Sequence, residues 1–104
     1  MAQKKDFKFN TELLELSQFH FALSHPARLR IIRRLRTSPG FSFNDLTSGM
    51  PLHRATISQH VGILRRIGLI LPYELEDSSL GYQLNQEMYT YAKELIESYL
   101  QQVA

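Results

Sequence analysis

The chain of 104 residues contains no cysteine, no membrane-length apolar run and no signal-peptide pattern. Without cysteine it forms no disulfide, no thiolate metal site and no cysteine nucleophile. A membrane-spanning helix needs about 20 consecutive apolar residues, and a secretory signal places a basic, an apolar and a small-residue region in that order. We therefore expect a soluble cytoplasmic protein that does not contact a membrane.

The sequence also lacks the motifs of common enzyme classes. It has no glycine-framed nucleophile, no phosphate-binding loop and no segment of paired carboxylates. Its histidines, at positions 20, 25, 53 and 60, show no His-x-x-x-His spacing that would present two imidazoles to one ion. We expect no catalysis, no cofactor and no metal. His20 and His60 are interpreted as hydrogen-bonded structural residues, and His53 as a helix cap or a phosphate contact.

Positive charge is concentrated in the first 72 residues. They hold eleven Lys and Arg and four Asp and Glu, a net charge of +7. Residues 73–104 hold one Lys and six Asp and Glu, a net charge of −5. A basic surface favours a polyanion, because each neutralised phosphate releases counterions. This asymmetry supports nucleic acid as a partner, although ordinary solvated charge remains an alternative.

One domain spanning residues 1–104 is expected, since the chain is short and has no internal repeat. Residues 1–10 read as a flexible basic arm. Helices are predicted from Asn10 or Thr11 to about Leu23, from about Pro26 to Thr37, from Phe43 to about Ser48, from about 53 to 67, and from about Gln86 to Val103. In the second, a buried stripe is expected at Leu29, Ile31, Ile32 and Leu35, with arginines at positions 28, 30, 33, 34 and 36 around the rest of the helix.

The fourth predicted helix has the pattern of a DNA-recognition helix. Ile57, Val61 and Leu64 fall on one face, and the opposite face is small, polar and cationic. Such a face can enter the major groove, where Gln59 pairs with a base edge and Arg54 reads guanine. For Arg66, phosphate contact and simple solvation are equally open. The predicted DNA-binding residues are His53, Arg54, Ala55, Thr56, Ser58, Gln59, Gly62 and Arg66.

A β-hairpin follows the recognition helix. Strand patterns run from Leu69 to Leu75 and from Leu80 to Leu84, with a turn at Glu76–Ser79. The fold class is therefore mainly α, with a small β component: a winged helix-turn-helix whose hairpin separates the fourth and fifth helices. Acidic residues on the hairpin would repel phosphate, so either the wing stays clear of DNA or binding is weak.

The first and last predicted helices carry more apolar residues than one buried face requires. The economical explanation is a two-fold homodimer built from these two helices, and a broad buried face within a monomer is the alternative. The predicted interface residues are Leu13, Leu16, Phe19, Tyr89, Ile96, Leu100 and Val103.

Together, three segments resemble the ArsR/SmtB family of bacterial repressors. They are Leu23–Ile31, Asp45–Leu46 and Thr56–Val61, followed by Leu64, Gly68 and Leu69. The resemblance covers about Leu13 to the C-terminus. It implies a homodimeric winged-helix repressor that leaves its operator when an effector binds, with Arg54, Ala55, Ser58 and Gln59 at positions that approach the operator.

The chain departs from the family at its usual metal sites. Many members carry a cysteine pair just before the Asp-Leu of the third helix, where this chain has Ser42 and Asn44. Other members use histidines on the last helix, which has none here. Neither metal site is therefore expected, and the effector is unknown.

The sequence thus predicts a homodimeric, sequence-specific DNA-binding regulator, a repressor acting at a palindromic operator on double-stranded DNA. Two alternatives remain open: a winged-helix module that contacts another protein through its acidic wing and tail, and a sensor of small organic ligands like those of the MarR family.

Overall fold

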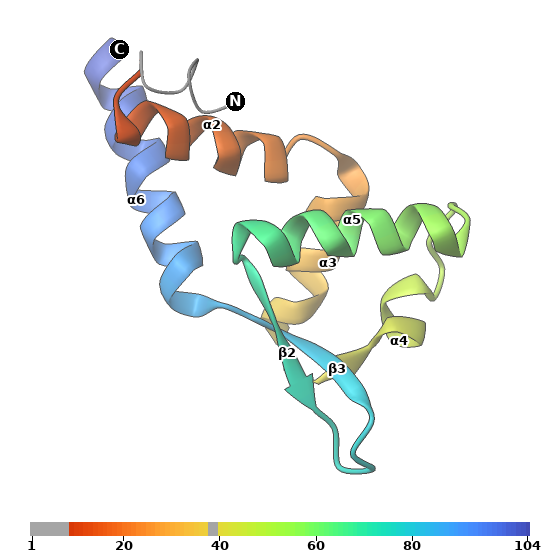
Figure 1. Ribbon diagram of the computed structural model, residues 1–104. Coiled ribbons are helices and arrows are strands. Elements are labelled where there is room, and N and C mark those ends of the chain that lie inside the picture. The colour runs from red at the N-terminus through yellow and green to blue at the C-terminus, as the bar shows by residue number, and fades with distance from the viewer. Residues whose placement is uncertain (1–8, 38–39) are drawn as a thin grey trace.

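The computed structural model describes residues 9–37 and 40–104. The predicted order of helices and hairpin is confirmed, with one short strand added (Figure 1). Most of the predicted basic arm, and Ser38 and Pro39, lie outside the described residues. In chain order the elements are α2 (Thr11–Ala22), α3 (Pro26–Thr37), β1 (Phe41–Ser42), α4 (Phe43–Thr47), α5 (Arg54–Ile67), β2 (Ile70–Glu74), β3 (Leu80–Leu84) and α6 (Gln86–Val103).

Polar side chains fix where the helices begin. Asn10 accepts a hydrogen bond of 2.8 Å from the backbone N–H of Leu13 at the start of α2. Ser42 forms a reciprocal capping box at the start of α4. These side chains satisfy backbone donors that have no partner inside the helix, so the helix starts read from the sequence are confirmed. No helix in the described part of the chain is long and apolar enough to cross a bilayer.

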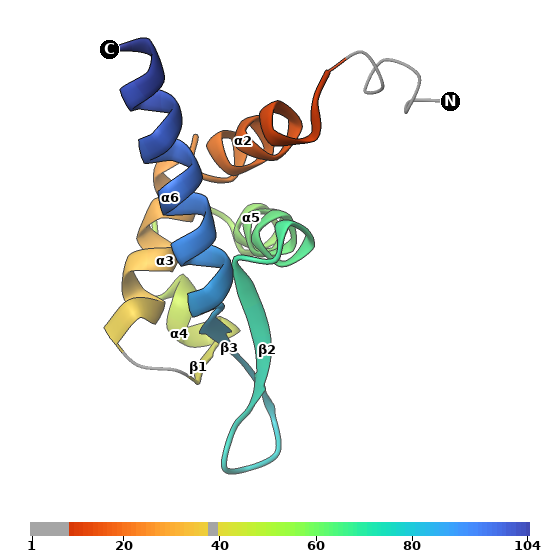
Figure 2. The same ribbon diagram turned by 90° about the vertical axis from the view of Figure 1, so that its left-hand side faces the viewer.

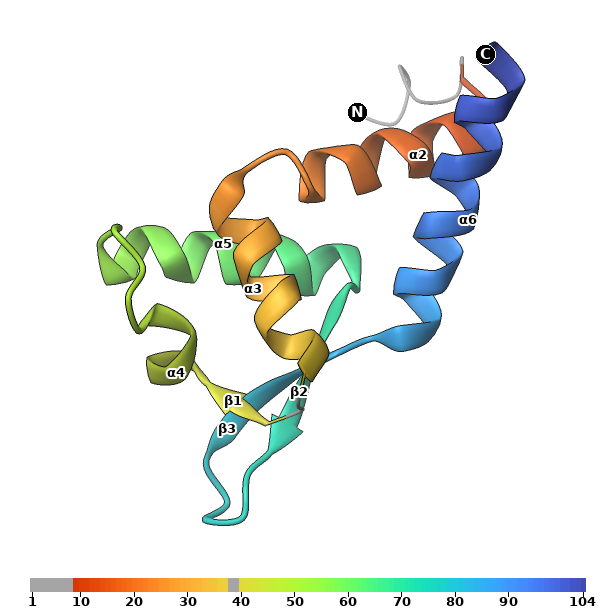
Figure 3. The same ribbon diagram turned by 180° about the vertical axis from the view of Figure 1, so that it is seen from behind.

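The core lies where α3 and α5 cross. The predicted stripe of α5 is confirmed, because Ile57, Val61 and Leu64 are all buried. Figure 1 shows α5 across the front of the molecule with α3 behind it, and Figure 3 shows the same pair from the opposite side. This packing holds one side of α5 and leaves the other side outside the core.

The predicted stripe of α3 was partly wrong. Leu29 is 45% exposed, whereas Arg28 is only 4% exposed. The buried side of α3 follows the spacing of Arg28, Ile31 and Leu35, which is the i, i+3, i+7 pattern of one helix face. The arginine occupies a core position because the structure supplies acceptors for each of its hydrogen-bonding nitrogens, as described below.

A three-stranded antiparallel sheet has the order β1-β3-β2. The hairpin of β2 and β3 forms the wing, and its register pairs Ile70 with Leu84 and Glu74 with Leu80. Strand β1 was not predicted, because it has only two residues and pairs Phe41 with Tyr82. This short pairing attaches the segment before α4 to the base of the wing.

Helices α2 and α6 pack against each other beside this core (Figure 2). The rings of Phe19 and Tyr91 meet edge to face with their centroids 5.9 Å apart, and the Tyr91 hydroxyl donates to Glu15. Leu16 and Phe19 are 6% and 4% exposed within one protomer, so they have no surface left for a partner. The prediction that these two residues form a dimer interface is therefore corrected.

The end of α5 depends on a left-handed residue, Gly68, with φ at +88°. Alanine there should lower the free energy of unfolding by about 1 to 2 kcal/mol, because L-residues are strained in this conformation. A Cβ atom would meet Met88 at 3.4 Å, which is an ordinary contact, so backbone strain is the cause. Urea unfolding followed by circular dichroism measures the change.

Gly62→Ala is the matched control, since Gly62 lies inside the same helix and its Cβ would approach only Arg66, at 3.7 Å. This change should raise the free energy of unfolding by up to about 1 kcal/mol through helix propensity. Equal effects of the two substitutions would contradict the role assigned to Gly68.

Candidate nucleic-acid interface

The outer face of α5 is open to solvent. Ala55, Ser58 and Gln59 are exposed, as are Arg54 and Arg66. The predicted contact residues Thr56 and Gly62 are half-buried, and His53 is exposed at the N-cap position. The His53 side chain makes no capping hydrogen bond, so the cap interpretation of this residue is wrong.

A shallow hollow runs along the same face. It is lined by Ser58, Gln59, Gly62, Ile63 and Arg66. The absence of a side chain at Gly62 lets another surface approach the helix axis at this point. The face therefore combines close approach with hydrogen-bonding groups, which is what a helix in a DNA groove requires.

Arg54 is oriented by an aromatic ring from the preceding helix. Its guanidinium carbon lies 4.8 Å from the centroid of the Phe43 ring. A cation above an aromatic face is attracted by the ring quadrupole, and stacking leaves the edge of the guanidinium available for hydrogen bonds. Sequence reasoning missed Phe43, and its only signal was its place as the first residue of α4.

A buried arginine joins α5 to the two helices before it. The Nε and Nη2 atoms of Arg28 donate to the carbonyl oxygens of Ala22 and Phe21 at 2.9 and 2.8 Å. Nη2 also donates to the Ser24 hydroxyl, and Nη1 donates to Nδ1 of His60 at 2.9 Å. Arg28 therefore ties the end of α2 and the start of α3 directly to the recognition helix.

Neutral groups stabilise the charge of Arg28. The two carbonyls belong to the C-terminal end of α2, which carries the negative end of the helix dipole. The guanidinium carbon also lies 4.9 Å from the centroid of the Phe21 ring. Dipole, ring and hydrogen bonds together replace the water that the guanidinium loses on burial.

His60 is a structural residue, as predicted. Because an arginine only donates, Nδ1 of His60 must be the acceptor and its proton must sit on Nε2. The ring of His25 lies against it, with centroids 4.2 Å apart. Burial lowers the pKa of His60 below its ordinary value of 6.5, and the neighbouring His25 and Arg28 lower that pKa further.

The tip of the wing is acidic and ordered by its own hydrogen bonds. Asp77 accepts hydrogen bonds from the backbone N–H and the hydroxyl of Ser79, and these lower the pKa of Asp77. Glu74 and Glu76 of the same hairpin are also exposed. Asp77 therefore keeps its negative charge at neutral pH.

The neutral state of His60 should make stability depend on pH. A histidine with a lowered pKa in the folded state binds fewer protons than the unfolded chain, so stability rises with pH. Its contribution is present above pH 6.5 and is lost as the pH falls below that value. Urea unfolding measured between about pH 7.5 and 5 reports this loss.

His60→Asn should flatten that pH dependence, since the asparagine oxygen replaces Nδ1 as acceptor and does not titrate. His53→Asn is the control, because His53 is exposed and forms no capping bond. The assignment is refuted if His60→Asn keeps the slope of the parent protein while His53→Asn loses it.

The model of a helix-turn-helix domain family matches residues 23–72. Three solved structures share the architecture. An ArsR-like transcriptional regulator from Rhodococcus sp. RHA1 is 21% identical, with 86% of this chain and 83% of that chain covered and a TM-score of 0.72. HlyU from Vibrio cholerae N16961 is 25% identical, with 88% of this chain and 99% of that chain covered and a TM-score of 0.66.

The cadmium metal-sensor CMTR from Mycobacterium tuberculosis is 26% identical, covers 78% of this chain and 82% of that chain, and has a TM-score of 0.58. No curated protein matches the sequence. The matched segment runs from the end of α2 to β2 and so includes both helices of the motif and the start of the wing. This chain contains a helix-turn-helix domain, and its winged helix-turn-helix architecture is similar to that of ArsR-like transcription regulators.

Proposed function

We propose that this protein is a sequence-specific DNA-binding transcription regulator, a repressor whose α5 enters the major groove. The observation that carries the proposal is the outer face of α5, where small and polar side chains are exposed on a helix whose other face is fixed in the core. A rigid helix with such a face matches the recognition helix of a helix-turn-helix protein.

The residues of this face have different roles in the proposal. Gln59 reads an adenine edge, and Arg54, held on Phe43, reads guanine or a phosphate. Arg66 contacts phosphate at the other end of the helix. Ala55 and Gly62 allow close approach, while His53, Thr56 and Ser58 contact the backbone or a base edge.

The charge distribution supports the same orientation. Residues 1–72 carry the net positive charge, whereas the hairpin carries Glu74, Glu76 and Asp77. Phosphate repels these acidic residues, so we place the wing beside the duplex and not in its minor groove. DNA affinity then comes from α5 and the arginines around it.

We further propose that the chain, as a single domain, forms a homodimer through exposed apolar residues of α2 and α6. Leu13, Leu100 and Val103 are 44%, 53% and 65% exposed. The last turns of α6 project past α2 (Figure 2), where a second copy can pack against them. A two-fold dimer matches a palindromic operator in the cytoplasm, with half-sites about 34 Å apart.

Gln59→Ala should relax base preference without abolishing DNA binding. A side chain that pairs with a base edge contributes about 1–3 kcal/mol of discrimination against the wrong base. The parent and the variant are compared by fluorescence anisotropy on a sequence selected from random double-stranded DNA and on a scrambled version. If the ratio of the two affinities is unchanged, Gln59 does not contribute to base recognition.

Arg66→Ala is the complementary variant. If Arg66 contacts phosphate, it should weaken binding to both DNAs equally and lower the salt slope by about 1. A module that only contacts other proteins would show no preferred DNA sequence at any salt concentration, which would favour the protein-contact alternative.

Leu100→Glu should convert the dimer to a monomer and weaken operator binding, because a charge would be placed in the proposed apolar interface. Light scattering measures the mass, and anisotropy measures the affinity. Leu80→Glu is the matched control for the mass measurement, since Leu80 is 52% exposed on the wing and Leu100 is 53% exposed on α6. A parent protein that is already monomeric at micromolar concentration would overturn the dimer.

A further inference from the structure

Two hollows lie side by side between α3 and α6, away from the outer face of α5. One, of about 390 Å³, lies between Ile32 of α3 and Tyr89 of α6. The other, of about 230 Å³, follows α6 along Ala92 and Ile96. Both are lined by Leu23 and Tyr89, so together they form one α3–α6 groove, within the range of about 300–1,000 Å³ typical of small-molecule sites.

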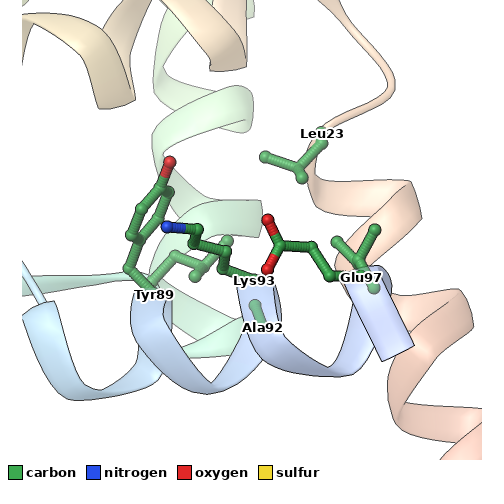
Figure 4. A pocket seen from close by; sticks show the side chains of 7 residues that line it. Leu23, Tyr89, Ala92, Lys93 and Glu97 are labelled. Atoms are coloured by element: carbon green, nitrogen blue, oxygen red, sulfur yellow. The ribbon is translucent and has the colours of Figure 1, made fainter. Parts of the chain in front are cut away.

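The groove is mainly apolar along its length. Figure 4 shows Tyr89, Lys93 and Glu97 on the side of α6 that faces Leu23, with the Lys93 side chain extending toward the Tyr89 ring. Leu29 lines the α3 end and is 45% exposed, although it is a leucine in the middle of a helix. An apolar surface of this shape favours an extended apolar ligand.

The two ends of the groove differ in charge. The α6 end carries one lysine and one glutamate, Lys93 and Glu97. The α3 end carries Arg33 and Arg36, and no acidic residue lines that hollow in the described part of the chain. The arginines are three positions apart in α3, so they lie on the same side of the helix.

We propose that the α3–α6 groove binds an amphipathic organic anion, with an extended apolar body along Leu23 and Tyr89 and one carboxylate held by Arg33 and Arg36. The guanidinium group matches a carboxylate in a two-point hydrogen bond, which makes arginine the preferred partner for this group. A neutral or cationic molecule of the same shape leaves both arginines without a partner.

A second copy of the chain is the competing occupant, and position on α6 argues against it. Tyr89 lies in the first turn of α6, whereas Val103, in the proposed dimer surface, lies at its end. The fourteen residues between these positions correspond to about 21 Å along the helix. The end of the groove that holds Arg33, Arg36 and Tyr89 therefore lies at the opposite end of α6 from Val103. Its other end reaches Ile96 and Glu97, about one turn before Leu100. A carboxylate can thus bind at the α3 end without displacing a partner packed on the last turns of α6.

Hydrogen bonds of Asn85 connect the groove to the recognition helix. Asn85 caps α6, and its Nδ2 donates to the carbonyl of Gly68 at 2.9 Å. Its backbone N–H donates to the carbonyl of Leu69, also at 2.9 Å. The first turn of α6 is thus attached to the end of α5, so a ligand that moves this turn shifts α5 and lowers DNA affinity. This regulatory step rests on the proposed function, whereas ligand binding does not.

Isothermal titration calorimetry with decanoate, decanol and decylammonium, at concentrations below micelle formation, tests the site. We expect the parent protein to bind decanoate at least tenfold more tightly than the other two. Replacing Arg33→Gln and Arg36→Gln together should remove this preference. Arg30→Gln is the control, because Arg30 lies on the same helix but beside Gly49, outside the groove.

Three results would overturn the site. They are no measurable decanoate binding, equal binding of decanoate and decanol, or the same loss of affinity in Arg30→Gln. If the Arg33 and Arg36 double variant becomes monomeric by light scattering, the occupant is a second copy and the proposal is wrong.

The regulatory step is tested separately on DNA. Saturating decanoate should lower the affinity of the parent for its selected sequence at least threefold and leave the affinity of the double variant unchanged. Decanoate binding without this loss overturns the regulatory step alone. Failure of the protein to prefer any DNA sequence without decanoate refutes the proposed function, and calorimetry still decides the ligand site.

Discussion

The whole arrangement depends on how firmly α5 is held, and Arg28 is the residue that connects α5 to the helices before it. Its four hydrogen bonds reach two carbonyls of α2, the hydroxyl of Ser24 and the ring of His60. Burying a guanidinium without an acidic partner is costly unless every donor finds an acceptor. Because these acceptors come from separate elements, the cost is offset only when α2, α3 and α5 are in their native positions. The arginine thus specifies the position of the recognition helix as well as stabilising it.

Local signals predicted most of this fold. Caps such as Asn10 and Ser42 fixed helix starts, and the apolar period of Ile57, Val61 and Leu64 identified the inner face of α5. The errors arose where tertiary contacts override residue type. Arg28 has the helical spacing of a core residue, but its charge led to a surface assignment, and only acceptors from distant segments make its burial possible.

The candidate site was predictable to a similar degree. The exposure of Ala55 and Gln59 follows from their place opposite the apolar stripe, which sequence alone defines, and Ser58 lies at the flank of that face. The stacking of Arg54 on Phe43 and the link between Asn85 and Gly68 require the turn geometry between elements. The apolar surplus on α2 and α6 was recognised from the sequence and explained either as a dimer interface or as a broad buried face within a monomer. In the structure these residues divide into three groups: buried Leu16 and Phe19, groove residues such as Tyr89, and exposed residues at the far ends.

This division gives α6 two tasks on one helix. Its first turn is bound to the end of α5 through Asn85 and faces the arginines of α3, while its last turns are exposed and apolar. A rigid helix transmits a displacement at one end to the other with little loss, since its hydrogen bonds run along its whole length. In a dimer joined through the last turns, a small change at the first turn would alter the distance between the two copies of α5. Half-site spacing on DNA is fixed by the helical repeat, so such a change would lower affinity without altering any side chain that touches a base.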